Sequence, residues 1–275
     1  MEVVAVVAGE GRIRAGDRCA VSPYQYCGRC LACRNGKTNC CERLQVLGVH
    51  IDGGMREFIV VSSAQLFPSP SLSLEQLALV EMLGIGAHAV RRSNLRESDS
   101  VLVIGAGPIG LSVTAYARLA GGTVAVMETN PVRRTFCSSA FDGVRTIDGS
   151  LPSIDAVRSI LDGELPDVVF DATGSRASME RAFELTAPGG RLVLVGLHKG
   201  AITFDDPEFH RRELTLLATR NSTGEDFDHV ISSLESGQVD IRPWISQRKS
   251  GGDIVGDFER WAAPESGVVK TLVEF

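Results

Sequence analysis

The spacing of apolar residues changes about a third of the way along the chain. Before about residue 86, short apolar runs alternate with Gly-rich turns, and this pattern predicts β-strands at residues 2–7, 18–22 and 57–61. A helix is predicted to start at Ser73, because Ser73 as N-cap and Gln76 form a capping box ahead of an apolar run. The first 85 residues are therefore predicted to be mainly β.

Beyond residue 86, strand and helix patterns alternate. Continuous apolar runs predict strands at residues 100–104, 123–127, 167–171, 190–195 and 214–218, and a final strand at 268–273. Helical patterns occupy residues 108–120, 178–186 and 225–235. Strands that are apolar at every position are buried on both faces, so the alternation predicts an α/β fold with a parallel, doubly wound sheet.

Composition excludes several classes of protein. A net charge of −6, without a run of Lys or Arg, gives no basic face for nucleic acid. No apolar stretch reaches the roughly 20 residues that a membrane-spanning helix needs. The amino-terminal residues lack the basic leader of a signal peptide. We expect a cytoplasmic protein with no nucleic-acid or membrane partner.

Cysteines are concentrated in one short segment, residues 27–41, with the even spacing Cys27, Cys30 and Cys33. In a cytosolic chain such spacing favours zinc over disulfides. Four thiolates on a flexible turn form a closed tetrahedral site with no position for water, so the zinc is predicted to be structural. The spacing leaves either Cys40 or Cys41 as the fourth ligand.

The predicted strand at 101–104 runs into a Gly-x-Gly-x-x-Gly turn followed by a predicted helix, which together indicate a dinucleotide site. Gly105 permits the tight turn, Gly107 lets the backbone approach a pyrophosphate, and Gly110 permits close helix–strand packing. The candidate cofactor contacts here are Gly105, Gly107, Pro108, Ile109 and Gly110. The alternative is a Gly-rich turn that binds no nucleotide.

An acidic residue at the end of the next strand bears on the choice of cofactor. Glu128 is placed to accept hydrogen bonds from the adenosine ribose and to repel a 2′-phosphate, which favours NAD over NADP. Arg133 and Arg134 follow closely and weaken that preference.

Several further motifs accompany the cysteines and the Gly-rich turn. They are Val46–Gly54, Leu79-Val-Glu81, Gly86-Ala-His88, Asp171-Ala-Thr-Gly174, Val195-Gly-Leu197 and Arg220-Asn221. With these, the chain resembles the zinc-containing medium-chain dehydrogenases over essentially its whole length, within the sorbitol, threonine and sugar-acid branch. Residues 205–210 together with 220–223 look most like L-galactonate dehydrogenases, which oxidise a sugar acid to a keto acid.

The resemblance implies a Rossmann domain inserted into a partial GroES-like β-barrel domain. The implied boundaries are residues 1–85 for the barrel with its zinc lobe at 27–41, 86–221 for the NAD-binding domain, and 222–275 for the return to the barrel domain. It also implies NAD and zinc as cofactors, a polyol or sugar acid as substrate, and a homodimer or homotetramer.

Individual residues take implied roles from the same resemblance. Cys41 is favoured over Cys40 as the fourth ligand of the structural zinc. Glu81 matches a ligand or near neighbour of a catalytic zinc. His50 lies on a segment that approaches the substrate cleft, where a structural hydrogen bond is an equal alternative. Further implied cofactor contacts are Thr173, Val195, Gly196, Leu197 and Lys270, although Lys270 could equally be a solvated lysine.

Arg220 follows a strand at the edge of the sheet where ligands bind, and its guanidinium could pair with a sugar-acid carboxylate. The alternative is an Arg at a subunit or domain boundary.

The family's other catalytic-zinc ligands lie in a Cys-Gly-x-Asp-x-His-like stretch and a Gly-His-Glu stretch, and neither occurs in this sequence. Glu81 alone cannot hold the ion. The resemblance implies that the chain begins several dozen residues late. We expect a fragment of a complete dehydrogenase that oxidises a secondary alcohol on a polyol or sugar acid. The alternative is a truncated product that binds NAD and a structural zinc but turns over little.

Overall fold

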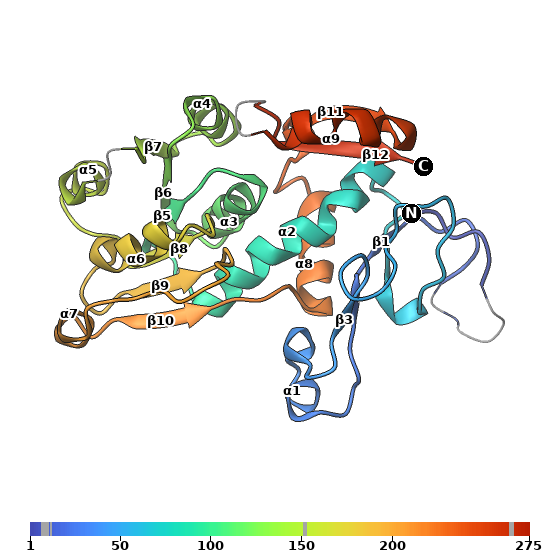
Figure 1. Ribbon diagram of the computed structural model, residues 1–275, viewed down its shortest axis with the longest axis horizontal. Helices are drawn as coiled ribbons and strands as arrows, with labels where there is room; N and C mark the ends of the chain where they lie inside the picture. The colour runs from blue at the N-terminus through green and yellow to red at the C-terminus, as the bar shows by residue number, and fades with distance from the viewer. Residues whose placement is uncertain (7–10, 12, 151–152, 264–266) are drawn as a thin grey trace. The chain divides into compact units, whose positions relative to one another are not determined.

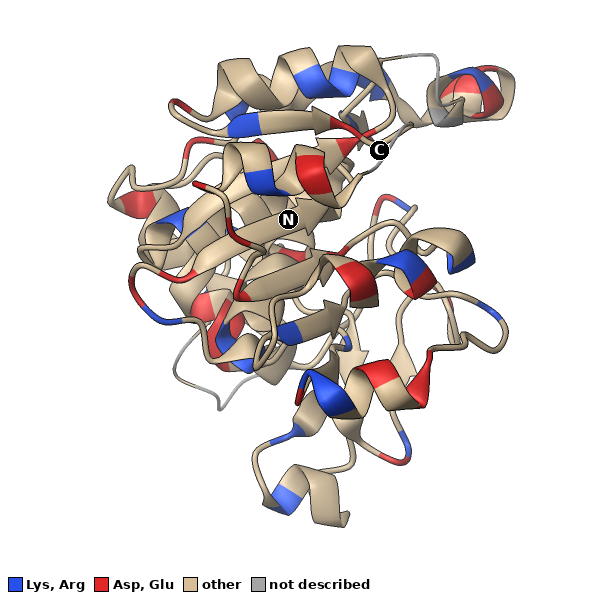
Figure 2. Ribbon diagram, turned by 90° about the vertical axis from the view of Figure 1, so that its left-hand side faces the viewer, with Lys and Arg blue, Asp and Glu red and all other residues tan. Residues whose placement is uncertain are grey.

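The computed structural model describes residues 1–6, 11, 13–150, 153–263 and 267–275 (Figure 1). The chain divides into two compact units, one made of Met1–Gly84 with Asn221–Phe275 and the other of Ile85–Arg220. Acidic and basic residues are interspersed along the ribbon (Figure 2), as the sequence predicts. Among the described residues, no helix is both long and apolar enough to cross a membrane.

The unit Ile85–Arg220 is built on one parallel sheet of six strands in the order β10-β9-β8-β5-β6-β7. The chain starts at the centre with β5, moves outward through β6 and β7, and returns to β8 on the other side of β5. This order confirms the predicted doubly wound sheet, and its switch point lies between β5 and β8. The strands are β5 (Ser100–Ile104), β6 (Thr123–Glu128), β7 (Arg145–Asp148), β8 (Val168–Asp171), β9 (Arg191–Leu194) and β10 (Thr215–Ala218).

Helices connect these strands and bury the sheet's apolar side chains. Leu102, Val169 and Leu192 come from three neighbouring strands and are completely buried, together with Leu185 of α6. This burial explains why the strands read as continuous apolar runs in the sequence. The helices of this unit are α3 (Pro108–Leu119), α4 (Pro131–Ala140), α5 (Ile154–Ile160), α6 (Arg176–Leu185) and α7 (Asp206–Arg211).

The other unit contains small sheets and short helices. Its strands pair as β1 (Cys19–Val21) with β4 (Leu66–Pro68), β2 (Tyr24–Gln25) with β3 (Gln45–Val46), and β11 (Ile245–Ser250) with β12 (Lys270–Glu274). The first two pairs are antiparallel and the third is parallel. Its helices are α1 (Leu31–Arg34), α8 (Gly224–Glu235) and α9 (Ile254–Ala262), with 3₁₀ turns η1 (Thr38–Cys40), η2 (Ser63–Gln65), η3 (Arg242–Trp244) and η4 (Gly251–Asp253).

Helix α2 (Leu74–Ser93) begins where the sequence predicts. The Ser73 N–H donates to Gln76 Oε1 at 3.0 Å, and the Gln76 N–H donates to Ser73 Oγ at 3.2 Å, so the predicted capping box is present. The helix continues to Ser93, well past the apolar run that predicted it.

Two strands predicted near the amino terminus are not formed as predicted. Residues 57–61 form no strand, and Phe58 and Val60 are 64% and 97% exposed. A β-rich sequence needs a neighbouring strand to pair its backbone groups, and the described residues supply none to this segment. In the predicted strand 2–7, Glu2 forms one isolated bridge with Arg18, and residue 7 lies outside the described residues.

Candidate cofactor pocket and metal centre

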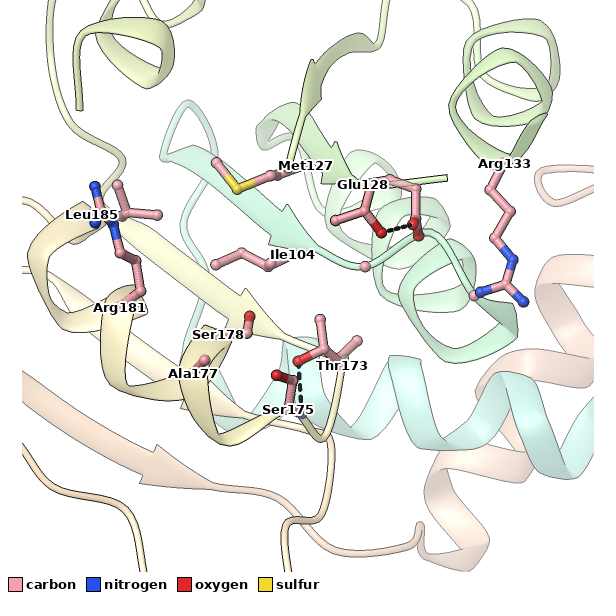
Figure 3. Close-up of a pocket in the computed structure, with 15 residues that line it drawn as sticks. Ile104, Met127, Glu128, Arg133, Thr173, Ser175, Ala177, Ser178, Arg181 and Leu185 are labelled. Atoms are coloured by element: carbon pink, nitrogen blue, oxygen red, sulfur yellow. Dashed lines mark hydrogen bonds between the residues drawn. The ribbon is translucent and has the colours of Figure 1, made fainter. Parts of the chain in front are cut away.

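A cavity of about 600 Å³ lies at the switch point of the sheet, at the carboxyl ends of β5, β6 and β8 (Figure 3). This is the position at which doubly wound sheets bind their ligands. The residues that line it include Ile104, Gly105, Gly107, Met127, Glu128, Thr129, Arg133, Ala172, Thr173, Ser175, Ser178 and Arg181.

The three glycines of the turn after β5 have different structural requirements. Gly105 has a φ of +98°, which favours glycine. A Cβ on Gly110 would lie 1.7 Å from the Gly105 carbonyl oxygen, so no larger residue fits there. A Cβ on Gly107 would meet only Arg133 Nη1, at 3.9 Å, and Gly107 is the N-cap of α3. The space beside Gly107 is therefore available to a ligand, next to the free N–H groups of the helix terminus.

Pro108 and Ile109 open α3 directly after this N-cap. Pro108 stands in the first turn, where a residue without an N–H costs the helix nothing. The predicted arrangement of strand, glycine turn and helix N-terminus is therefore present, and its free space opens into the cavity.

Glu128 does more than the sequence indicates. Its Oε2 accepts a hydrogen bond from the Ala106 N–H at 2.7 Å, and its Oε1 accepts one from the Asn130 N–H at 2.8 Å. The Thr129 hydroxyl donates to Oε1 at 3.2 Å, and the side chain lies in the cavity wall although the residue is only 7% exposed. The carboxylate thus fixes the Gly-rich turn, and these three bonds leave about one of its roughly four acceptor positions unused.

The two arginines after β6 point in different directions. Arg133 lines the cavity. The Arg134 guanidinium instead donates to the carbonyl oxygens of Glu128 and Thr129, both at 2.8 Å, and forms an ion pair with Asp148 at 3.0 Å. Of these two arginines, Arg133 is therefore the one that faces the cavity.

The remaining predicted cofactor contacts are divided. Thr173 lines the cavity, whereas Val195, Gly196 and Leu197 are not among its lining residues. The Val195 and Gly196 N–H groups donate to the Asp171 carbonyl oxygen, and Leu197 is 82% exposed. Lys270 begins β12 and pairs with Ile245 in the other unit.

The Sγ atoms of Cys27, Cys30, Cys33 and Cys41 lie within 4.8 Å of one another. A zinc ion with Zn–S bonds of about 2.3 Å holds its four sulfurs roughly 3.8 Å apart, so this group fits a zinc tetrahedron. Cys40 is exposed and stands outside the group.

Backbone N–H groups point at these sulfurs. The Cys30 N–H donates to Cys27 Sγ at 3.4 Å, and the Cys27 and Arg43 N–H groups donate to Cys41 Sγ, each at 3.3 Å. Hydrogen bonds from the Arg29 and Cys30 N–H groups lower the pKa of Cys27 to about 6. Burial, and then the neighbouring Cys30, raise the pKa of Cys33 to about 12. A divalent cation would allow all four thiols to ionise together.

Glu81 has a partner that the sequence did not indicate. It accepts a hydrogen bond from the Tyr24 hydroxyl, and burial together with the Glu81 charge raises the pKa of Tyr24 above its ordinary value. Within the described ranges, the four-cysteine cluster is the one group of three or more His, Cys, Asp or Glu side chains that could hold a metal. Glu81 stands outside it, so the described residues do not fit a catalytic zinc.

His50 and Arg220 occupy exposed positions. The His50 Nδ1 accepts a hydrogen bond from the Val46 N–H at 3.0 Å, which closes the local turn. Arg220 follows β10 at the carboxyl edge of the sheet. Neither residue lines the cavity at the switch point.

Sequence reasoning missed Asp171 and Ser178 as parts of this site. Asp171 is completely buried at the end of β8, and Ser178 lines the cavity from the first turn of α6. The available signal was an acidic residue that ends an otherwise apolar strand.

Comparisons with known proteins agree with this geometry. Residues 2–71 match an alcohol dehydrogenase GroES-like domain, and residues 108–236 match a zinc-binding dehydrogenase domain. The L-galactonate-5-dehydrogenase of Escherichia coli K12 is 36% identical over 279 residues, covering 100% of this chain and 82% of that protein. The sorbitol dehydrogenase of Bacillus subtilis 168 is 32% identical over 280 residues, covering 99% and 78%.

Solved structures match as well. An alcohol dehydrogenase from E. coli CFT073, complexed with NADH, superposes with a TM-score of 0.91 at 27% identity, covering 98% of this chain and 80% of that one. A zinc-binding dehydrogenase from Sinorhizobium meliloti 1021, bound to NADP, superposes with a TM-score of 0.90 at 28% identity, covering 99% and 80%.

Proposed function

The chain belongs to the zinc-type alcohol dehydrogenase family, and on that premise we propose that it serves the NAD-dependent oxidation of a secondary alcohol on a polyol or sugar acid. The observation that carries the proposal is the cavity at the switch point, where open space beside Gly107 meets the carboxylate of Glu128. A bound NAD supplies a nicotinamide ring that accepts a hydride.

Each part of the cavity has a distinct task in this proposal. The N-terminus of α3, with Gly107 as its N-cap, holds the pyrophosphate through free N–H groups. Glu128 accepts a hydrogen bond from a ribose hydroxyl while its bond from the Ala106 N–H fixes the Gly-rich turn. The negative charge of Glu128 disfavours a 2′-phosphate. Arg133 opposes that preference from the same wall, so the selectivity for NAD over NADP is expected to be moderate.

The substrate class is proposed from the relatives. L-galactonate and sorbitol are named for proteins that match nearly the whole chain, and both carry secondary alcohols. A sugar acid also carries a carboxylate, which Arg220 at the carboxyl edge of the sheet is suited to pair with.

We propose that residues 85–220 form the NAD-binding domain and that residues 1–84 and 221–275 form the substrate-binding domain. We also propose that the protein is a homodimer or homotetramer.

A second candidate function is an NAD-binding protein with a structural zinc and little turnover. Two observations favour it. Within the described residues, the four cysteines are the one group suited to a metal, and Glu81 accepts a hydrogen bond from the Tyr24 hydroxyl.

One experiment separates the two candidates. The purified, zinc-loaded chain is assayed for NADH formation with L-galactonate and with sorbitol, its zinc content is measured, and its NADH affinity is determined by fluorescence. Turnover supports the dehydrogenase, whereas tight NADH binding with one zinc and no turnover supports the second candidate. A chain that binds neither NAD nor NADH contradicts both.

If the protein turns over both substrates, Arg220→Leu is expected to raise KM for the aldonate and leave sorbitol unaffected. Equal losses on both substrates would remove Arg220 from the proposal.

A further inference from the structure

The end of β8 carries a carboxylate that is completely buried and lies directly behind the cavity wall. Asp171 is 0% exposed, and each of its hydrogen bonds comes from a neutral donor. Oδ1 accepts from the Thr173 N–H at 2.9 Å and from the Thr173 hydroxyl at 2.6 Å, and Oδ2 accepts from the Ser178 hydroxyl. Removing a charge from water costs free energy unless hydrogen bonds compensate. A completely buried carboxylate at this position is therefore expected to have a specific role.

An ionised carboxylate can only accept, so it fixes the direction of both hydroxyls that it holds. The Thr173 O–H must point at Asp171, which leaves a lone pair on Thr173 Oγ1 for the Ser175 N–H at 3.0 Å (Figure 3). The Thr173 methyl group then faces the Gly-rich turn, since its Cγ2 lies 3.2 Å from where a Cβ on Gly105 would stand.

The same residue holds two other segments. The Ser178 hydroxyl belongs to the first turn of α6, so its bond to Asp171 anchors the start of that helix. The Asp171 carbonyl oxygen accepts from the Val195 and Gly196 N–H groups, each at 2.9 Å. A Cβ on Gly196 would lie 2.2 Å from the Gly174 nitrogen, so the backbones of the turns after β8 and β9 are in close contact.

We propose that Asp171 is a positioning residue for the dinucleotide, and this inference rests on the proposed function. Its carboxylate holds residues 172–175 and the start of α6 in the conformation that forms one wall of the cavity. Thr173, Ser175 and Ser178 line that wall, whereas Asp171 lies behind them and does not line the cavity. Without the carboxylate, the wall would relax toward Gly105 and the crevice would lose its preformed width.

The test compares Asp171→Ala with Asp171→Asn, measuring NADH affinity by fluorescence and amide hydrogen exchange at Thr173 and Ser175 in the cofactor-free protein. Asp171→Ala leaves three donors without an acceptor, and we expect Kd for NADH to rise about tenfold or more. Asp171→Asn keeps one oxygen acceptor and gives Ser178 an N–H to accept, so we expect a rise of about threefold or less. Exchange at both amides should accelerate in the same order.

Asp99 provides the matched control. It is a half-buried acid at the amino end of β5, paired with Arg191, and it lies outside the cavity lining. Asp99→Ala is expected to lower the thermal midpoint and leave Kd for NADH unchanged. If Asp171→Ala also lowers the midpoint but leaves Kd within twofold of wild type, Asp171 is only a stabilising residue and the inference is wrong.

A further variant covers the case in which Asp171→Ala does not fold. Thr173→Val keeps the shape of the side chain but removes the hydroxyl, and its effect on Kd should not add to that of Asp171→Asn if both act through one network. Additive effects would overturn the inference. A wild-type chain that binds no NADH overturns the proposed function itself, while the amide exchange still reports whether Asp171 holds the turn.

Discussion

The two candidate ligand sites of this protein are built in opposite ways. The Gly-rich turn after β5 stands on a six-stranded sheet whose central residues are completely buried. The cysteine lobe, residues 27–41, consists of a one-turn helix and a 3₁₀ turn, and Cys41 and Asn39 are its buried residues. One site is held by packing, whereas the other is held by a few backbone hydrogen bonds and the gathered sulfurs.

The two sites therefore differ in the source of their stability. Burial of apolar surface keeps the dinucleotide cavity open before any ligand arrives, so cofactor binding has little structure left to form. A metal that binds the lobe instead contributes its binding free energy to local folding. Four predictions test the contrast, beginning with the largest expected effect.

Metal removal should unfold the lobe and leave the dinucleotide site intact. Structural zinc sites contribute about 10 kcal/mol or more of apparent binding free energy, so chelation should abolish amide protection across residues 27–41. The Kd for NADH should stay within about twofold, because the cavity is formed by residues of the other unit. Hydrogen exchange and NADH fluorescence, with and without chelator, check both. A protected lobe after chelation would show that packing holds it as well.

Gly110→Ala should damage the packed site most. The new Cβ would lie 1.7 Å from the Gly105 carbonyl oxygen, so α3 and the turn must separate. We expect a loss of about 3 kcal/mol or more of unfolding free energy, together with the loss of NADH binding. Denaturant unfolding measures the first and fluorescence the second. A stable variant that still binds NADH would contradict the close packing described above.

Gly107→Ala is the matched substitution in the same turn. Its Cβ would enter open space, with Arg133 Nη1 at 3.9 Å as the nearest atom. We expect unfolding free energy to change by less than about 1 kcal/mol, while Kd for NADH rises about tenfold because the methyl group occupies ligand space. Unchanged NADH affinity would place the dinucleotide elsewhere.

The smallest effect on stability is expected from ionisation of the thiols. Their reactivity should also differ between the packed unit and the cysteine lobe. Burial raises the pKa of Cys137 in α4 to about 12. Its contribution to stability is fully present below its unfolded pKa of about 8.5 and is lost as pH rises toward 12. In the metal-free protein, where the lobe is expected to unfold, Cys27 should react with iodoacetamide much faster than Cys137, because the Cys27 thiol is then exposed to solvent whereas Cys137 stays buried in α4 with a raised pKa. Mass spectrometry that finds Cys137 modified as fast as Cys27 would contradict this.

The sequence predicted the packed unit far better than the other one. Strands β5, β6, β8, β9 and β10 were predicted within one or two residues, because burial on both faces makes them continuously apolar. Strand β7 was missed, since its Arg145-Thr-Ile-Asp148 sequence has one buried apolar residue at the sheet's edge. Residues 57–61 were predicted to form a strand but form none, because strand propensity does not report whether a partner strand is available.

The candidate site divides in the same way. The glycines and Glu128 were found because each imposes a local requirement at a fixed spacing. The different orientations of Arg133 and Arg134, and the Asp171 network, depend on the direction in which each side chain points in the folded turns, which residue spacing does not report. The hydrogen bond from the Tyr24 hydroxyl to Glu81 was missed because it joins residues 57 positions apart.

The division of one unit between the two ends of the chain has a consequence for its synthesis. Ser69 bonds to Glu235, and Glu75 pairs with Arg248, across sequence separations of 166 and 173 residues. At about 5–20 residues per second, the ribosome needs roughly 10–30 s to make the residues between such partners. During that interval the early segment lacks these partners, whereas every strand of the sheet in Ile85–Arg220 comes from one continuous stretch of chain. Nascent chains of this protein should therefore engage chaperones through the segment before Ile85 until the residues after Arg220 have been synthesised.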